Sequence, residues 1–209
     1  INEDNPVVKM NNSPNWVKCA IDAPMSYKPG TKFQYNSGGV MILDHIISKE
    51  TGMHADKYAE KQLFSRLGIR NYYWSKQHIF FGTAHTGGGL YLRPRDLAKI
   101  GQLILNKGRW EGEQIVSEEW ISKSLEKHVE SVPLGILRAG YGYLWWIFPD
   151  KSAQNLDIYA CMGSGGQYMF IIPQHNLIVV TAGNEFDDRY TGINGALVML
   201  NDYILKSLH

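Results

Sequence analysis

The hydrophobic pattern of this chain changes its period near residue 140, and that change constrains the fold more than any other feature of the sequence. Before it, apolar residues recur at helical spacing in three segments: 38–50, 56–66 and 94–106. After it, apolar runs have the length of strands in three segments: 157–162, 168–172 and 177–182. Helices followed by antiparallel strands and a final helix predict an α+β fold. We therefore divide the chain into a mostly helical region, 1–140, and a sheet region with the C-terminal helix, 141–209.

Local signals give the predicted elements their ends. Ser37 is expected to cap the first helix and Gly52 to end it, and Ser117 is expected to cap a later one. The predicted buried face of the first helix comprises Val40, Leu43, Ile46 and Ile47. The predicted buried face of the last helix comprises Ile193, Leu197, Leu200, Ile204 and Leu208. Residues 173–176 predict the turn of a hairpin.

Three further segments lack a clear helical period. Residues 1–30 are predicted to be loop with one short helix, anchored by Trp16 and Val17. Residues 69–92 are predicted to be loop, with a tight turn at three consecutive glycines. The aromatic segment 141–148 is predicted to form one strand or twisted ribbon.

The charge balance and the motif content exclude several classes of protein. Lys and Arg number 21 and Asp and Glu 20, and they are interspersed, so the chain has no basic stripe for a nucleic acid. No apolar run approaches the roughly 18 residues of a membrane span. The histidines lack ligand spacing and the glycines lack a following Lys-Ser/Thr, so neither a metal nor a cofactor is predicted. Cys19 and Cys161 allow one disulfide or none.

The segment Pro29 to Gly39 places Tyr35 and Ser37 at a predicted helix start. A helix start carries unpaired N–H groups and a partial positive charge. A tyrosine held there can act as a general base. The structural alternative is that Tyr35 is a half-buried aromatic residue and Ser37 only a cap.

The segment Cys161 to Tyr168 places Ser164, Gly165 and Gly166 at the end of a predicted strand. Small residues there let a substrate lie against the backbone and expose an N–H group to a developing oxyanion. The structural alternative is a glycine-rich bend between two strands.

Together these two segments resemble a known family. Pro29-Gly-x-x-Phe-x-Tyr-x-Ser37, followed by a helix that ends in Thr-Gly, resembles the second motif of the serine β-lactamase and penicillin-binding-protein superfamily. Further matches follow in the family's order: 88–101, 141–146 and 165–173. The chain is most similar to the class C β-lactamase-like branch, with its esterases, DD-peptidases and amide hydrolases. The resemblance implies a β-lactamase/transpeptidase-like fold.

The resemblance also implies acyl transfer. A serine in Ser-x-x-Lys attacks a carbonyl, an acyl-enzyme forms, and water releases it. By position, Tyr35 is the proton-transferring residue. The residues implied to bind substrate are Ser37, Ser164, Gly165, Gly166 and Gln167. In this assignment the main-chain N–H of Gln167 faces the oxyanion.

The sequence departs from the family pattern in two places. Ser164 stands where the family often has Lys or His, so a preference for substrate carboxylates is not implied. No segment before Tyr35 contains Ser-x-x-Lys, and the one match in the chain, Ser124 to Lys127, follows the tyrosine motif. We interpret that match as chance and expect it on the charged side of a surface helix.

These departures lead to further expectations. The chain starts at Ile1 without a signal peptide, and we expect the C-terminal part of a larger serine hydrolase, without turnover by itself. Strand 177–182 is expected to have an open edge and to bind either a second copy or the missing N-terminal segment. Family habit suggests a periplasmic or extracellular location.

Two other interpretations remain open at this point. The chain can belong to a non-catalytic relative that binds a ligand or acts as a scaffold. It can also be an unrelated α+β module, in which case Tyr35 and Gly166 should lie far apart.

Overall fold

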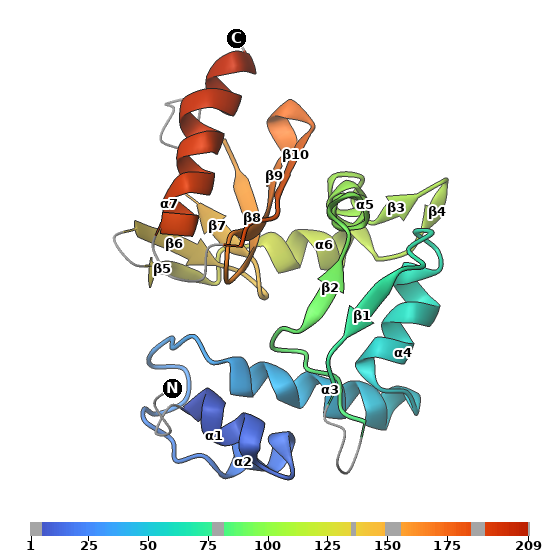
Figure 1. Ribbon diagram of the computed structural model, residues 1–209, viewed down its shortest axis with the longest axis vertical. Helices are drawn as coiled ribbons and strands as arrows, with labels where there is room; N and C mark the ends of the chain where they lie inside the picture. Colours follow the sequence, from blue (N-terminus) through green and yellow to red (C-terminus); the bar gives the residue numbers. More distant parts are fainter. Residues whose placement is uncertain (1–5, 77–81, 135–136, 149–155, 185–190, 209) are drawn as a thin grey trace. The chain divides into compact units, whose positions relative to one another are not determined.

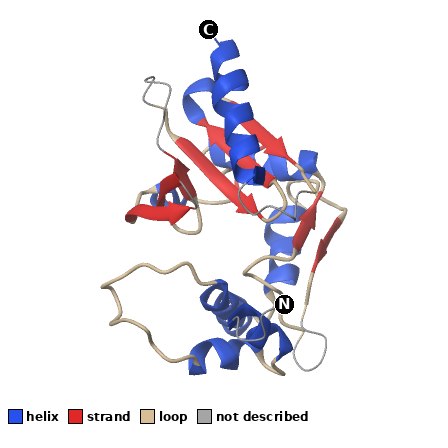
Figure 2. Cartoon of the chain, turned by 60° about the vertical axis from the view of Figure 1, so that its left-hand side comes forward, coloured by secondary structure: helices blue, strands red, loops and turns tan. Residues whose placement is uncertain are grey.

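The computed structural model of the chain describes residues 6–76, 82–134, 137–148, 156–184 and 191–208 (Figure 1). The chain divides into two compact units, residues 1–92 and 93–209. The first unit is mainly helical, whereas the second combines a larger antiparallel sheet with further helices (Figure 2). The division at 140/141 that we drew from the sequence lies inside the second unit, because its sheet already begins at Val129.

The first unit is built mainly from short helices. Its elements are α1 (Pro6–Asn12), α2 (Trp16–Asp22), α3 (Ser37–Thr51), α4 (Ala55–Ala59), the π-helical turn η1 (Glu60–Phe64), β1 (Tyr72–Trp74) and β2 (Leu90–Leu92). Strands β1 and β2 pair antiparallel. Met10, Trp16 and Met41, one from each of the first three helices, form a buried cluster.

Helix α3 confirms one predicted end and corrects the other. Gly52 ends the helix with φ 72°, a left-handed conformation that glycine adopts without strain. At the start, the N-cap is Asn36, whose Oδ1 accepts a hydrogen bond from the main-chain N–H of Gly38 at 3.0 Å. Ser37 is therefore the first residue of the helix rather than its cap.

The buried face of α3 also differs from the prediction. Asp44 is fully buried, whereas Leu43 and Ile46 are exposed. The Asp44 carboxylate accepts a hydrogen bond from the main-chain N–H of Ala55 and contacts Nδ1 of His54, both at 2.7 Å. These polar contacts connect α3 to the start of α4 and turn the Asp44 side of α3 inward. Hydrophobic spacing alone does not predict that orientation.

Two segments are more regular than the sequence suggested. The described residues 6–30 contain two short helices, α1 and α2, where the sequence predicted one, and Trp16 is buried as predicted. Residues 69–92 contain β1 and β2 instead of loop alone. Each of these strands has only three residues, which is too short for an alternating pattern to stand out.

The second unit contains a six-stranded antiparallel sheet in the order β10-β9-β8-β7-β6-β5. Before the sheet come α5 (Pro94–Leu105), β3 (Arg109–Trp110), β4 (Glu113–Gln114) and α6 (Glu118–Leu125). The strands of the sheet are β5 (Val129–Leu134), β6 (Leu137–Tyr141), β7 (Trp146–Phe148), β8 (Ile158–Gly163), β9 (Gln167–Ile172) and β10 (Leu177–Thr181). The C-terminal helix comprises α7 (Thr191–Val198), the π-helical η3 (Met199–Ile204) and the 3-10 turn η4 (Leu205–Leu208).

Several sequence signals in this unit are confirmed, and with them the α+β fold. Helix α5 begins at Pro94, and Ser117 caps α6 by accepting a hydrogen bond from the N–H of Trp120 at 3.2 Å. The hairpin between β9 and β10 turns through the 3-10 turn η2 (Pro173–His175) and Asn176, which has φ 48°.

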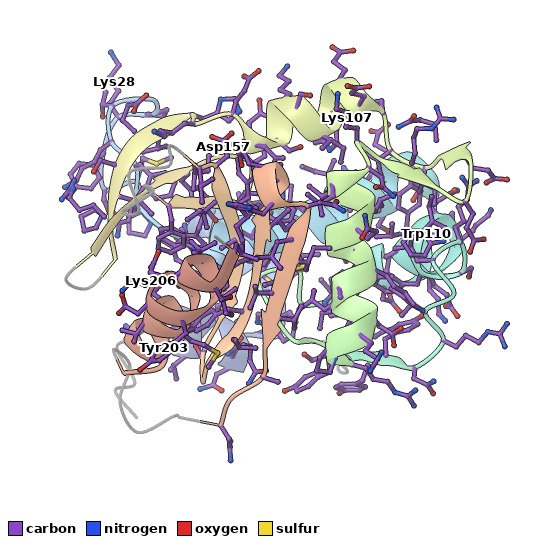
Figure 3. All side chains as sticks on the ribbon, turned by 90° about the horizontal axis from the view of Figure 1, so that it is seen from above. Lys28, Lys107, Trp110, Asp157, Tyr203 and Lys206 are labelled. Atoms are coloured by element: carbon purple, nitrogen blue, oxygen red, sulfur yellow. The ribbon has the colours of Figure 1, made fainter. Side chains whose placement is uncertain are left out.

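Strand β9 lies at the centre of the core of this unit. Its residues 168–172 are all buried. Helix α5 packs against β9 and β10, and a Cβ built on Gly101 would lie 3.0 Å from both Met169 and Ile178, so the glycine permits this close approach. Figures 1 and 3 show β9 and β10 between α5 and the C-terminal helix.

The C-terminal helix confirms part of its predicted face, since Leu200 is buried and Leu197 and Ile204 are half-buried, but the face changes at its end. Leu200 and Leu205 are fully buried, whereas Leu208 is exposed. Tyr203 is on the exposed side (Figure 3). A π-helix bonds residues five apart, so the turn η3 places positions 200 and 205 on one face. The side chain of Ile193 lies outside the described part.

Residues 141–148 form parts of two strands rather than one. Tyr141 ends β6 and Trp146 begins β7, and the N–H of Gly142 donates to the carbonyl of Trp145 at 2.9 Å across the turn between them. Leu144 has φ 65° in this turn, a conformation that is uncommon for a residue with a side chain. The aromatic residues on both sides of the turn made it resemble one continuous strand.

Candidate functional site

Tyr35 and Ser37 lie at the start of α3 in the first unit. The Tyr35 side chain is 55% exposed, and Ser37 is half-buried. Because Asn36 makes the capping hydrogen bond, that bond does not use the Ser37 hydroxyl. Asparagine is as good an N-cap as serine, so the Tyr-Asn-Ser order already contained this signal.

The glycine-rich turn of the first unit packs directly on the first turn of α3. The Thr86 hydroxyl donates to the carbonyl of Val40 at 2.7 Å, and the N–H of Gly87 donates to Sδ of Met41 at 3.4 Å. A Cβ built on Gly87 would lie 2.8 Å from the carbonyl oxygen of Ser37. A residue with a side chain therefore does not fit at position 87 without moving the start of α3.

Aromatic contacts support the same turn from its other side. Nε1 of Trp74 donates to the carbonyl of His85 at 3.0 Å. The His85 ring meets the ring of Trp16 edge-on, with 5.2 Å between centroids. Trp16 belongs to the buried cluster with Met41, so α2, the start of α3 and the glycine-rich turn form one packed assembly that carries Tyr35.

Ser164, Gly165 and Gly166 form the turn between β8 and β9 in the second unit. Gly163 and Gln167 face each other at the ends of the two strands. Gly165 and Gly166 have φ of 83° and 87°, a region in which a Cβ is strained. Ser164 is exposed at the start of the turn.

The main-chain N–H of Gln167 points into the hairpin, toward Gly163. The Gly166 carbonyl accepts a hydrogen bond from the N–H of Gly183 at 3.2 Å, on the β10 side. The peptide between Gly166 and Gln167 is trans, so its N–H points the opposite way, toward β8. The alternation of an antiparallel ladder agrees, since it makes residues 163 and 167 a hydrogen-bonded pair. This direction differs from the sequence assignment, in which that N–H faces an oxyanion.

The end of β8 has an open edge on its other side. Strand β7 pairs with β8 only as far as Ala160. Beyond it, the same alternation directs the N–H and C=O of Met162 and the N–H of Ser164 away from β9. Among the described strands, none lies beside residues 162–164 on this side. Two main-chain donors and one acceptor therefore stand at this edge.

The Ser-x-x-Lys match at 124–127 does not form a nucleophile pair. Ser124 is buried and its hydroxyl donates to the carbonyl of Trp120 at 2.6 Å, which corrects the expectation of a charged surface. Helix α6 ends at Leu125, so Lys127 lies outside the helical turn that would bring its ammonium beside the hydroxyl. Nζ of Lys127 instead lies 3.8 Å from the carboxylate of Glu130. Chance remains the best explanation of this match.

Neither cysteine forms a disulfide; both are free thiols. Burial raises the pKa of the Cys161 thiol to about 12, so it stays protonated near neutral pH and is a poor nucleophile. Within the described ranges, no three His, Cys, Asp or Glu side chains are grouped to hold a metal ion. A search of the same ranges finds no helix with the length and apolar character of a membrane span.

The two candidate segments belong to different units: Tyr35 and Ser37 to the first, and the Ser164–Gly166 turn to the second. Their convergence on one cleft stays a prediction. The residues that hold the segments in place were missed in the sequence analysis. Asn36 had a recognisable capping signal, whereas Thr181, whose hydroxyl bonds to the Gly166 carbonyl, had none.

Comparison with known proteins gives a family match over nearly the whole chain. The family described as Beta-lactamase matches residues 4–199. The 6-aminohexanoate-dimer hydrolase of Paenarthrobacter ureafaciens is 25% identical over 160 residues, which cover 71% of this chain and 38% of that protein. The N-acetylmuramyl-L-alanine amidase of Bacillus subtilis (strain 168) is 22% identical over 206 residues, which cover 78% of this chain and 46% of that protein.

A solved structure shows the same fold. A Bacillus anthracis protein, provisionally assigned as a 6-aminohexanoate-dimer hydrolase, has a TM-score of 0.74 and 23% identity, covering 92% of this chain and 49% of that one. This chain thus spans half or less of the length of each of these three proteins.

Proposed function

This chain belongs to the beta-lactamase family, and we propose that it forms the acyl-binding part of a serine hydrolase that cleaves an amide or ester by acyl transfer. Tyr35 moves protons between the nucleophile and the leaving group. Ser37 and the Ser164–Gly166 turn each keep the substrate-binding role that the family resemblance implies. The nucleophilic serine and its lysine come from a segment outside these 209 residues.

The open edge of β8 is the observation that carries this proposal. Fixed N–H donors stabilise the oxyanion of a tetrahedral intermediate more than they stabilise the ground-state carbonyl. The N–H of Ser164 faces the open side, whereas that of Gln167 faces Gly163, so Ser164 replaces Gln167 as the oxyanion donor. The neighbouring C=O of Met162 can accept a hydrogen bond from an N–H group next to the substrate's carbonyl. A linear amide has such an N–H group.

The buried and bonded Ser124 hydroxyl supports an external nucleophile. The Ser124 hydroxyl already donates a hydrogen bond to the carbonyl of Trp120, and Lys127 is not placed to accept the proton of that hydroxyl. Without an activated nucleophile, an oxyanion donor has no intermediate to stabilise. The chain by itself is therefore proposed to be inactive.

The outer edge of β10 supports a partner segment. Among the described strands β10 pairs only with β9, in unbroken register from Leu177 to Thr181. It has no proline or charged residue, and apolar edges of this kind pair with other strands. In the proposal, the segment that carries the nucleophile adds a strand to the outer edge of β10. When that segment is absent, two copies of this chain associate through the same edge.

The names of two relatives support an amide as the substrate. One acts on the 6-aminohexanoate dimer and the other is an amidase. Ser164 brings no charge to the turn, so the turn supplies no cation for a substrate carboxylate. A linear amide without a carboxylate beside the scissile bond is the proposed substrate class, and esters and β-lactams are the alternatives to test.

The experiment compares this chain with the same chain extended by the coding sequence that precedes Ile1. Substrates are the 6-aminohexanoate dimer, a p-nitrophenyl ester and a chromogenic β-lactam. We expect saturable hydrolysis only from the extended protein. Tyr35→Phe should lower its kcat by about 10²–10⁴-fold, the usual contribution of a general base. Tyr73→Phe is the matched control, because that side chain is 56% exposed in the same unit.

Two outcomes would contradict the proposal. Saturable turnover by the 209-residue chain, lost on Tyr35→Phe, would place the nucleophile within it. An extended protein that binds the β-lactam but hydrolyses none of the three substrates would favour the non-catalytic relative instead.

A further inference from the structure

The end of β10 is bonded to the β8–β9 turn by contacts that the strand ladder does not provide. The Thr181 hydroxyl donates to the carbonyl oxygen of Gly166 at 2.9 Å. The same oxygen accepts a hydrogen bond from the N–H of Gly183 at 3.2 Å. Nε2 of Gln167 donates to the carbonyl of Gly183. Two side chains and one main-chain group thus hold the turn against the segment after β10.

The backbones at this contact lie too close for an additional side chain. A Cβ built on Gly183 would lie 2.6 Å from the carbonyl oxygen of Gly165 and 3.3 Å from Cα of Gly166. Gly165 and Gly166 both have positive φ, so the turn has a conformation that glycine alone adopts readily. The position of the turn is therefore set by direct contact with Gly183.

The hydroxyl of Thr181 is not needed to build β10. The four residues before it are apolar, and valine has the same branched shape without the hydroxyl. The Gly166 carbonyl already accepts from the N–H of Gly183, so the bond from Thr181 does not rescue an unpaired acceptor. Its effect is to fix the direction of that carbonyl from a second side.

The Gly166 carbonyl begins a line of peptide groups that ends at Ser164. The peptide of Gly166 continues as the N–H of Gln167, which points to the carbonyl of Gly163. The peptide of Gly163 continues as the N–H of Ser164, at the open edge of β8. Peptides joined in this way polarise one another, so a donor at one end strengthens the N–H at the other.

We propose that Thr181 and Gln167 are positioning residues for the main-chain N–H of Ser164. Thr181 fixes and polarises the first peptide of the line, and the Gln167 amide fixes Gly183, which donates to the same carbonyl. The role of Ser164 as oxyanion donor rests on the proposed function. The hydrogen-bond line itself does not, so it can be tested in this chain without any turnover.

The test uses NMR of the isotope-labelled 209-residue chain and two substitutions of Thr181. Thr181→Val keeps the shape and removes the donor, and Thr181→Ser keeps the donor. We expect Thr181→Val to speed amide exchange of Gln167 and Gly183 by about three- to tenfold, the equivalent of one hydrogen bond. The Gly166 carbonyl carbon and the Ser164 amide proton should both shift upfield. Thr181→Ser should restore all of these values.

The pattern of change separates positioning from a general loss of packing. A merely structural role predicts faster exchange throughout β9 in Thr181→Val, including Phe170, and no rescue by serine. That pattern would overturn the proposal, and so would an unchanged Ser164 amide shift in Thr181→Val. Gln167→Leu is the second variant, and it should move the Ser164 and Gly183 resonances while exchange at Phe170 stays unchanged. Failure of the hydrolysis experiment would leave these outcomes intact.

Discussion

The two edges of the six-stranded sheet are built differently. Strand β5 contains Pro133, exposed Glu130 and a bulge between Val129 and Val132. Strand β10 contains no such feature and pairs with β9 in continuous register. Natural sheets protect their exposed edges with proline, charge and bulges. The comparison teaches that β5 is built as a terminal strand, whereas β10 is built like an interior one.

Pro133 occupies the position where an edge strand tolerates proline. The N–H of His128 donates to the carbonyl of Tyr141, so the odd residues of β6 face β5. Val132, opposite Ala139, therefore faces β6, and the nitrogen of Pro133 faces outward. By the same alternation Val179 faces β9 and Val180 faces outward at the other edge. These registers allow the comparison to be tested residue by residue.

The largest effect is expected from Val179→Pro. This change removes an N–H that bonds within the sheet and leaves the carbonyl of the buried Phe170 without its donor. We expect a loss of about 3 kcal/mol in the free energy of unfolding, measured by urea denaturation. A loss below about 1 kcal/mol would show that the register of β10 has been assigned wrongly.

Val180→Pro should instead change association. It removes only an outward N–H, as Pro133 does at the other edge, so the loss of stability should be about 1 kcal/mol or less. The proposed self-association through β10, measured by sedimentation at increasing protein concentration, should weaken at least about tenfold. If Val180→Pro associates as the unmodified chain does, the β10 edge is not the interface.

Cys161 lies in β8, an interior strand of the same sheet, and its thiol gives a pH-dependent test of stability away from either edge. Burial raises the pKa of its thiol to about 12, whereas in the unfolded chain it ionises near its ordinary value of about 8.5. As the pH rises, the thiol ionises in the unfolded state before it does in the folded state, and this stabilises the unfolded state. The free energy of unfolding therefore falls between about pH 8.5 and about pH 12. Cys161→Ala should make the loss of unfolding free energy over this range smaller.

A second group, the half-buried Tyr159, also contributes to the loss of stability at alkaline pH, so the contribution of Cys161 has to be measured by comparison with Cys161→Ala. Burial also raises the pKa of that phenol, so part of the alkaline loss of stability remains in the variant. An identical pH dependence of unfolding in the two proteins would show that the thiol does not contribute.

The smallest effect is expected from Pro133→Val. The new N–H faces outward and gains no partner within the sheet, so the unfolding free energy should change by about 0.5 kcal/mol or less. Self-association should rise slightly, because the edge of β5 loses one of its protections. A gain in stability of more than about 1 kcal/mol would mean that this N–H bonds to β6 and that the comparison of edges is wrong.

Much of the fold was predictable because local chemistry fixes helix and turn ends. Gly52, Pro94 and Ser117 each act within one turn of backbone, and each does what the sequence indicated. The buried face of α3 and the burial of Leu205 in place of Leu208 at the end of the C-terminal helix were not predictable in this way. One depends on the contact of Asp44 with α4 and the other on a π-helical turn, and neither leaves a mark in hydrophobic spacing.

The same distinction applies to the candidate site: features set by neighbouring residues were predictable, and contacts between distant segments were not. The sequence located Tyr35 at a helix start and a glycine turn after a strand, since both depend on residues close in the chain. It assigned the oxyanion donor to Gln167, and the structure turns that N–H toward Gly163. Gly166 receives hydrogen bonds from residues 181 and 183, and a contact between distant segments is not visible in local pattern.

The amino-acid sequence by itself determined the family and the broad order of the α+β fold, in which helices are followed by antiparallel strands and a final helix. Only the tertiary structure decided which main-chain groups face the open edges of the sheet and which are already bonded. The reason is that a peptide's direction depends on the strand paired beside it, and a shift of one residue reverses it.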